Sequence, residues 1–252
     1  MPERTSGPPH PLKTWVLVLL AAAALAGAVG GWRWRRGRQE AATVLAALPP
    51  VPDLAAWPRD HAVRVRVATA AAQRRDEPAA ALRELALLYH ANGRYREAAA
   101  AERGLQALEP QNARWTYLLA DASEKLGDAD AERAWLEATL RLAPWYAAAR
   151  FRLADLLLKL GFPDQARAQY ERFLALVPGE PHARLGLARL ALDGGDRDGA
   201  TRELEALVRD HPDFPAAHNL LAEVHAVAGD AQRAGDADAS RDFARLLARP
   251  LP

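Results

Sequence analysis

Three histidines near the C-terminus have a spacing that could bind a metal ion. His211, His218 and His225 are seven residues apart, so the last two would share one face of a helix. Imidazole is a common ligand of zinc and other transition metals. However, a metal site needs converging ligands with supporting contacts, and His218 and His225 fall where an internal repeat elsewhere has Leu82 and Tyr89. We therefore expect both histidines to pack in a core, and we expect no metal site and no cofactor.

Side chains for nucleophilic catalysis are scarce. The chain has no cysteine, and its only serines are Ser6, Ser123 and Ser240, none of them within a Gly-x-Ser-x-Gly turn. There is also no Gly-rich phosphate-binding loop and no His-Glu-x-x-His run. Ser123 falls at a packing place of the same repeat. The sequence predicts a protein that is not an enzyme and has no small-molecule substrate.

The repeat itself consists of four residue columns that recur every 34 positions. Such agreement over five copies is not a product of composition, even in an alanine-rich chain. The columns are Pro110, Pro144, Pro178 and Pro212; Gly93, Gly127, Gly161, Gly195 and Gly229; Leu85, Leu119, Leu153, Leu187 and Leu221; and Ala86, Ala120, Ala154, Ala188 and Ala222.

Each copy predicts two antiparallel helices joined by a short turn. In the first copy, Leu82, Leu85 and Tyr89 lie on one helical face. The following glycine can close the helix in a left-handed conformation, and the proline ends the second helix. An aspartate after the glycine, as in Asp128, Asp196 and Asp230, can cap that second helix. The second copy has Glu132 where the others have alanine, so we expect its second helix to be rotated or shifted.

A helix–turn–helix period of 34 residues is the signature of the tetratricopeptide repeat, and the segment 79–249 resembles that family. The resemblance implies an all-α fold, in which five helical hairpins stack as a right-handed superhelical solenoid. It also implies that the first helices line a concave groove that binds a protein or peptide. The expected repeats are 79–112, 113–146, 147–180, 181–214 and 215–249.

The resemblance assigns candidate groove positions to these first helices. Family members that clamp a peptide carboxylate use asparagine and lysine at places where this chain has Leu87, Leu118 and Ala148. We therefore do not expect that clamp, although arginines in the groove could pair with an acidic segment. The candidate groove residues are Arg83, Arg114, Tyr117, Asp121, Phe151, Arg152, Asp155, Lys159, Arg189, Asn219 and Glu223.

The N-terminal segment has the features of a membrane anchor. Residues 1–13 are rich in proline and read as disordered. Residues 14–31 carry no charge and are flanked by Trp15, Trp32 and Trp34, as in a transmembrane helix with interfacial aromatic residues. The alternative is a cleaved signal peptide, because Ala26-Gly27-Ala28 fits the small-residue cleavage pattern.

The next segments read as a basic juxtamembrane and Pro-rich linker over 32–59 and a capping helix over 60–78. Asp60 could cap that helix, with Val63 and Val67 on its packed face, although the alternation of valine and arginine also suits a strand. We prefer the helix, because the chain has no other strand candidate.

Charge is unevenly distributed between the two parts of the chain. Residues 1–78 carry 11 Arg and Lys against 6 Asp and Glu, whereas residues 79–252 carry 22 against 26. The repeats therefore lack the basic surface of a nucleic-acid binder. The arginines after the apolar run favour repeats that face the cytoplasm by the positive-inside rule. The resemblance to anchored repeat proteins of bacterial envelopes implies the periplasm, and both sides stay open.

Together these features predict a membrane-tethered, non-catalytic scaffold in the bacterial inner membrane that binds a protein or peptide in its groove. Two alternatives are retained. One is a secreted or periplasmic binding module whose signal peptide is removed. The other is a regulatory or assembly subunit of an enzyme complex, with the chemistry supplied by another chain.

Overall fold

In the described part of the computed structural model, every regular element is a helix, and there is no β-strand. It comprises residues 11–75, 77–226 and 229, with side chains described from residue 24. The helices are α1 (Pro11–Ala47), α2 (Arg59–Arg74), α3 (Pro78–Ala91), α4 (Tyr95–Leu108), α5 (Ala113–Lys125), α6 (Ala129–Leu142), α7 (Ala147–Lys159), α8 (Pro163–Leu176), α9 (Pro181–Asp193) and α10 (Arg197–Asp210). Residues 215–226 are also helical.

The chain divides into two compact units, which are described separately. The first runs from Met1 to Glu132 and the second from Arg133 to Pro252, so the division falls in the first turn of α6. The first unit holds α1 to α5. The second unit holds the rest of α6, the helices α7 to α10 and the helical residues 215–226.

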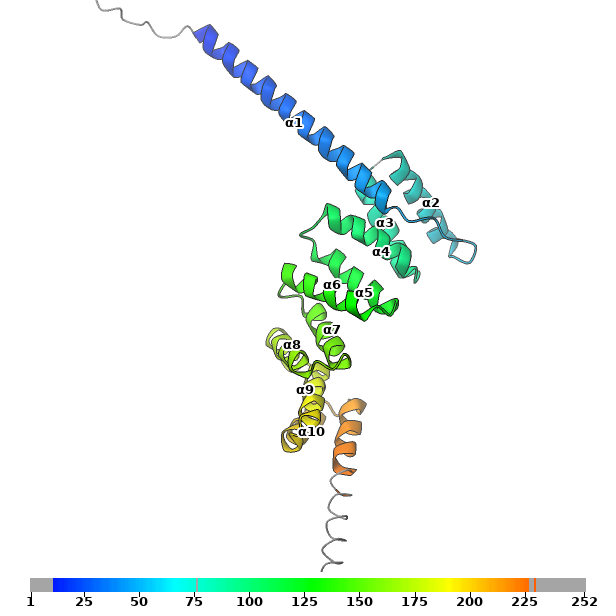
Figure 1. Cartoon of the computed structure of the whole chain (residues 1–252), viewed down its shortest axis with the longest axis vertical. Helices are drawn as coiled ribbons and strands as arrows, with labels where there is room; N and C mark the ends of the chain where they lie inside the picture. The colour runs from blue at the N-terminus through cyan, green and yellow to red at the C-terminus, as the bar shows by residue number, and fades with distance from the viewer. Residues whose placement is uncertain (1–10, 76, 227–228, 230–252) are drawn as a thin grey trace, which may run out of the picture. The chain divides into compact units, whose positions relative to one another are not determined.

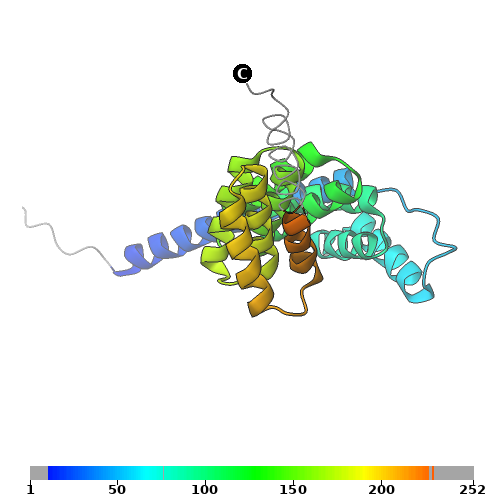
Figure 2. The same cartoon turned by 90° about the horizontal axis from the view of Figure 1, so that it is seen from below.

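Helix α1 has two parts with different environments. The side chains of residues 24–39 are all exposed, and in both views this part stands away from α2, α3 and α4 (Figures 1 and 2). Further on, Ala41 and Val44 are buried against the first unit. The helix continues to Ala47, which differs from the linker expected over 32–59. Only its proline-containing part, residues 48–58, lies outside helices.

Helix α2 confirms the preference for a helix over a strand, but its packed face was predicted wrongly. Val63 and Val67 are 49% and 60% exposed. The buried face instead contains Ala62, Val65 and Ala68, because alanines pack closely against α3. Asp60 does not cap the helix, because α2 starts one residue earlier and its N-cap is Pro58, without a side-chain hydrogen bond.

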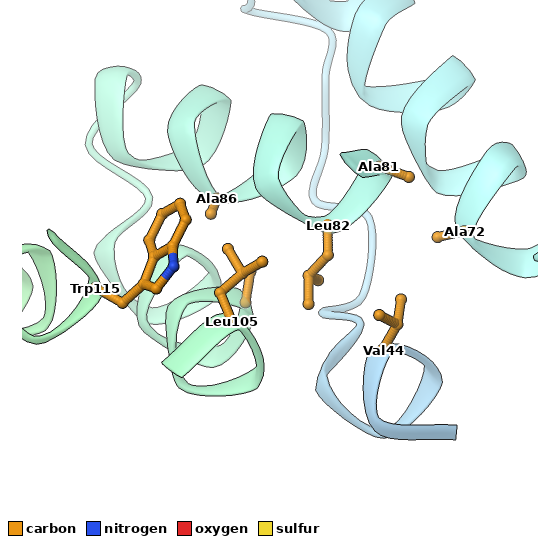
Figure 3. Packing of buried hydrophobic residues seen from close by; sticks show 8 residues of the cluster. Val44, Ala72, Ala81, Leu82, Ala86, Leu105 and Trp115 are labelled. Carbon is orange, nitrogen blue, oxygen red and sulfur yellow. The ribbon is translucent and has the colours of Figure 1, made fainter. Parts of the chain in front are cut away.

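One apolar cluster joins α1 to the first repeat (Figure 3). Val44 of α1, Leu82 of α3 and Leu105 of α4 are fully buried in it. Gly104 allows the close approach, because a Cβ atom there would lie 2.3 Å from the Cβ of Ala47. The end of α1 is therefore part of the folded first unit.

The second unit contains the same packing between the two helices of a repeat. In the third repeat, Leu153 and Ala154 of α7 are buried, and Ala166 and Phe173 of α8 are also buried. Helix α8 packs against both α7 and α9. A single hairpin leaves one apolar face open, and the neighbouring hairpin covers it.

The turns and caps of the repeats follow the sequence pattern. Gly93, Gly127, Gly161 and Gly195 have φ angles of 70°, 76°, 77° and 85°. The carboxylates of Asp128 and Asp196 accept hydrogen bonds from backbone N–H groups three residues on, at 3.0 and 2.9 Å, and so confirm the predicted caps. Asp230 lies outside the described residues.

The predicted shift of the second repeat is not observed. Helix α6 begins and ends 34 residues after α4, in register with the other second helices. Glu132 takes the alanine place and is only 7% exposed, and its side chain has an interaction partner. A partnered glutamate can therefore occupy a small buried place without moving the helix.

The predicted membrane span coincides with the first part of α1. The backbone of residues 14–31 is helical, and the side chains of residues 24–31 are exposed. Among the described residues, no helix is both long enough and apolar enough to cross a membrane. Residues 1–10 and residues 230–249 of the predicted fifth repeat lie outside the described part of the chain.

Packing in the third repeat gives a first prediction. Leu153 is 3% exposed, so we expect Leu153→Ala to lower the free energy of unfolding by about 2–5 kcal/mol through loss of contacts and a residual cavity. Arg172→Ala, at an exposed position of α8, should cost no more than about 0.5 kcal/mol. Urea titrations of the purified chain measure both values, and equal losses would show that the repeat register is wrong.

Candidate functional site

The second unit contains a groove that combines apolar, aromatic and charged side chains. Its volume is about 570 Å³, and it is lined by residues of α7, α8 and α9. Four predicted groove residues line it together: Phe151, Asp155, Lys159 and Arg189. Tyr170, His182, Leu185 and Gly186, which were not predicted, also line it. We take this groove as the candidate binding site in the described part of the chain.

The floor of the groove contains a buried tyrosine paired with an aspartate. The Tyr170 hydroxyl donates a hydrogen bond to Asp155 Oδ1 at 2.5 Å. Burial, with the hydrogen bond to Asp155 as the second cause, raises the pKa of Tyr170 far above its ordinary value. Tyr170 therefore stays neutral, and the bond fixes the position of the Asp155 carboxylate at the floor.

Gly186 in the middle of α9 makes room for this tyrosine. A Cβ atom at Gly186 would lie 2.5 Å from Cζ of Tyr170 and 2.9 Å from its hydroxyl. Because a mid-helix glycine weakens the helix relative to alanine, its presence here is explained by the close approach of the ring. Phe151 lies beside the same ring, with the ring centres 6.1 Å apart.

Charged groups of both signs border the groove. Lys159 and Arg189 are exposed, and neither forms an ion pair with another described residue. Asp193 is the acidic residue at this border. The His182 ring packs against Phe214 at 4.9 Å between ring centres. The arrangement can hold an extended segment that carries apolar and acidic side chains.

The predicted groove residues of the first unit are engaged in internal contacts. The Arg83 guanidinium pairs with Glu109 at 2.5 Å. Glu109 also accepts a hydrogen bond from the Trp115 indole at 2.8 Å. Arg114 is exposed and lies over the Trp115 ring at 5.5 Å, and Tyr117 is half-buried and has a partner. Arg83 and Arg114 therefore contact neighbouring side chains of the first unit.

A buried polar cluster replaces apolar packing between the first two repeats. His90 of α3 lies 2.8 Å from Oε1 of Glu102 on α4 and 2.9 Å from Oδ2 of Asp121 on α5. Glu102 is fully buried, and its Oε2 has no hydrogen-bond partner among the described residues. The bond to Glu102 raises the pKa of His90, and burial raises the pKa of Glu102. Asp121, predicted for the groove, therefore belongs to this cluster.

Two of the remaining candidates lie on the last described helix, and the third lies on α7. Asn219 and Glu223 are exposed, and Arg152 of α7 is half-buried and has a partner.

His218 and His225 are exposed as well, so the prediction that they pack in a core was wrong. The physical reason is the face that this helix buries, because Leu220 and Val224 contact Ala188 and Leu204. His218 instead bonds to the carbonyl oxygen of Pro212 at 2.9 Å.

Two family comparisons identify the repeats. One tetratricopeptide repeat profile matches residues 83–147 and a second matches residues 163–224. Together the two matches cover half of the chain. This chain belongs to the tetratricopeptide repeat family. Proteins of this family generally mediate protein–protein interactions and are typically non-catalytic scaffolds. A comparison with curated proteins found no match.

Solved structures of other tetratricopeptide repeat proteins share this fold. One from Parabacteroides merdae is 19% identical with a TM-score of 0.58, over 77% of this chain and 75% of that chain. MamA from Desulfovibrio magneticus, residues 41 to the end, is 19% identical with a TM-score of 0.56. The match covers 68% of this chain and 97% of that chain. YrrB, described as a tetratricopeptide repeat protein with an unusual peptide-binding site, is 20% identical with a TM-score of 0.56. The match covers 64% of this chain and 83% of that chain. At these identities the likeness concerns the fold alone.

The site residues that sequence reasoning missed are departures from the repeat pattern. Glu102 and Tyr170 stand at the place where the second and fourth copies have Leu136 and Leu204. Gly186 stands at a place where no other copy has glycine. Comparing the copies column by column would have singled out all three, whereas a search for known motifs could not.

The polar cluster predicts a stability that depends on pH. The pKa of His90 is raised above its ordinary 6.5 and that of Glu102 above its ordinary 4.5. The folded chain therefore holds both protons more tightly than the unfolded chain. The stabilisation by each group is complete below its ordinary pKa and is lost as the pH rises through its raised pKa. We expect the unfolding free energy of the chain to fall as the pH rises above 6.5, the ordinary pKa of histidine.

Two variants test the origin of this dependence. His90→Leu leaves the buried Glu102 carboxylate without its partner. We expect it to lower the free energy of unfolding by about 3 kcal/mol at neutral pH. Replacing both members, His90→Leu with Glu102→Leu, should restore the stability and flatten its pH dependence, since the fourth repeat holds leucine at both places, Leu192 and Leu204. Thermal unfolding from pH 5 to pH 9 measures this. A double variant with the pH slope of the natural chain would contradict the assignment.

Proposed function

We propose that this chain is a membrane-tethered, non-catalytic scaffold that binds a protein or peptide segment in the groove of its second unit. The observation that carries the proposal is the groove between α7 and α9, where Phe151 and Leu185 offer apolar contact beside Lys159 and Arg189. Protein–protein interaction is the general role of the family, so a peptide is the expected occupant.

The charges favour an acidic segment with apolar side chains. Lys159 and Arg189 stand at the border without carboxylate partners among the described residues, and arginine pairs with carboxylates in a two-bond geometry. The Asp155 carboxylate is held by Tyr170 through Oδ1, and its second oxygen would accept a backbone N–H from the bound segment. Apolar side chains of the segment would cover Leu158 and Leu185.

The tether is supported by the sequence and by the exposure of α1. Residues 14–31 carry no charge and would rise about 27 Å as a helix, close to the 30 Å of a hydrocarbon core. Leu25, Trp32 and Trp34 are 70%, 59% and 61% exposed, an arrangement that lipid would cover. The arginines Arg36 and Arg38 lie over the rings of Trp32 and Trp34 at 5.2 and 4.8 Å, as expected of an interfacial belt.

The groove is tested by reversing its charge. We expect Lys159→Glu with Arg189→Glu to abolish capture of the partner, because an acidic border repels an acidic segment. The control is Arg202→Glu at an exposed position of α10 outside the groove, which should leave capture unchanged. Tagged full-length chains are crosslinked in cells and recovered proteins are compared by mass spectrometry. Recovery of the same proteins in equal amounts by the groove variant would refute the proposal.

The tether is tested by membrane fractionation of the full chain. We expect it to remain in the membrane pellet through high salt and carbonate, and we expect deletion of residues 1–38 to release it. N-terminal sequencing of the mature protein separates the anchor from the export signal. A mature chain that begins at Val29 would show that the segment is removed and would favour a secreted or periplasmic binding module.

A further inference from the structure

The end of α2 differs from the ends of the repeat helices. Each repeat turn that needs a left-handed residue uses glycine, as at Gly93 or Gly127. At the end of α2 the residue in this conformation is Arg75, with φ 64°, whose N–H bonds to the carbonyls of Ala71 and Ala72. A side chain with a Cβ atom is disfavoured there relative to glycine or asparagine. Backbone strain of this kind often occurs where a side chain has a function.

Arg75 lines a hollow at the base of the exposed part of α1. The hollow has a volume of about 310 Å³, and Trp34, Arg38, Glu40 and Pro78 also line it. The Arg38 guanidinium lies 4.8 Å from the centre of the Trp34 ring. Neither Arg38 nor Arg75 forms an ion pair with another described residue. Arg38 of α1 and Arg75 at the C-cap of α2 therefore border one cavity, and Glu40 is the acidic residue among the described residues that line it.

The position of this hollow along α1 matches the depth of lipid headgroups. Trp34 and Arg38 follow the last residue of the uncharged run, Gly31, by three and seven residues. At about 1.5 Å per residue, these positions lie about 5–10 Å beyond the run. The headgroup layer of a bilayer extends about 5–8 Å from the hydrocarbon core on each side. A membrane that covers residues 14–31 would thus place phosphate groups beside the hollow.

We propose that this hollow binds the headgroup of an anionic phospholipid, a proposal that rests on the membrane tether proposed above. Arg38 and Arg75 would hold the phosphodiester, because guanidinium groups form paired hydrogen bonds with phosphate oxygens. Trp34 would lie along the glycerol backbone at the interface. Glu40 accepts hydrogen bonds, so it suits a headgroup that ends in hydroxyl groups, such as phosphatidylglycerol.

Such a site would give the protein a second attachment to the membrane. Arg38 belongs to α1, which carries the tether, whereas Arg75 caps α2, which packs on the first repeat. A lipid held by both arginines would therefore fix the first unit against the membrane surface. It would also explain why an arginine occupies a helix end where asparagine or glycine would be more stable.

The test is lipid binding by the full chain in a neutral detergent. The chain is titrated with dihexanoyl phosphatidylglycerol, dihexanoyl phosphatidylcholine or inorganic phosphate, and bound molecules are counted by native mass spectrometry. We expect one phosphatidylglycerol per chain, with at least tenfold weaker binding of phosphatidylcholine. Equal binding of the two lipids would overturn the proposal. Phosphate that binds as tightly as the lipid would overturn it too, since the site would then be a general anion site.

Substitutions separate this role of Arg75 from a structural one. Arg75→Asn should weaken phosphatidylglycerol binding at least tenfold while leaving the melting temperature equal or higher, because asparagine tolerates the left-handed conformation. Arg38→Gln should weaken binding similarly without touching that helix end. The control Arg66→Gln removes the same charge at an exposed position of α2 outside the hollow and should bind as the natural chain does. Binding by Arg75→Asn and Arg38→Gln within twofold of the natural chain would overturn the proposal.

Membrane fractionation of the same variants distinguishes this site from the tether. Variants that lose lipid binding should still resist carbonate extraction, because the apolar run is intact. A natural chain that is extracted by carbonate yet binds phosphatidylglycerol selectively would refute the tether and keep the site. A natural chain that resists extraction but shows no lipid selectivity would keep the tether and refute the site.

Discussion

The close packing of one helical hairpin on the next is the constraint on which this structure depends. A leucine is followed by an alanine in each first helix, and the facing second helices of the first, third and fourth repeats have alanine, at Ala98, Ala166 and Ala200, which allows the two backbones to approach. Each hairpin leaves an apolar face that only its neighbour covers, so no repeat is stable alone. The same requirement explains Gly104, where a glycine lets α1 pack as if it belonged to the repeats.

The candidate groove and the buried polar cluster both lie where the packing pattern is broken. At one place of the second helix, two copies have leucine, while the first has Glu102 and the third has Tyr170. Glu102 takes part in a buried cluster with His90, and Tyr170 positions Asp155 at the floor of the groove. Gly186 is a third departure, and it makes room for the tyrosine. The regular repeat provides the helical framework. Glu102, Tyr170 and Gly186 make the surface of one repeat differ from that of another.

The sequence predicted the repeated features well because they are local and periodic. Helix bounds, the turn glycines and the caps at Asp128 and Asp196 follow from spacing and conformational preference. The errors concern faces that depend on contacts distant in sequence. Helix α2 buries its alanines and Val65 and exposes Val63, because α3 offers room for small side chains. His218 and His225 are exposed because Leu220 and Val224 occupy the packed face.

Site-specific photocrosslinking tests most directly the claim that the groove of the second unit is the recognition surface. A benzoylphenylalanine placed at Leu185 lies in the groove, whereas one at Glu205 lies at an exposed position of α10 outside it. The account predicts a discrete crosslinked partner in living cells from position 185 and none from position 205. Equal crosslinking from both positions, or crosslinking from 205 alone, would contradict it.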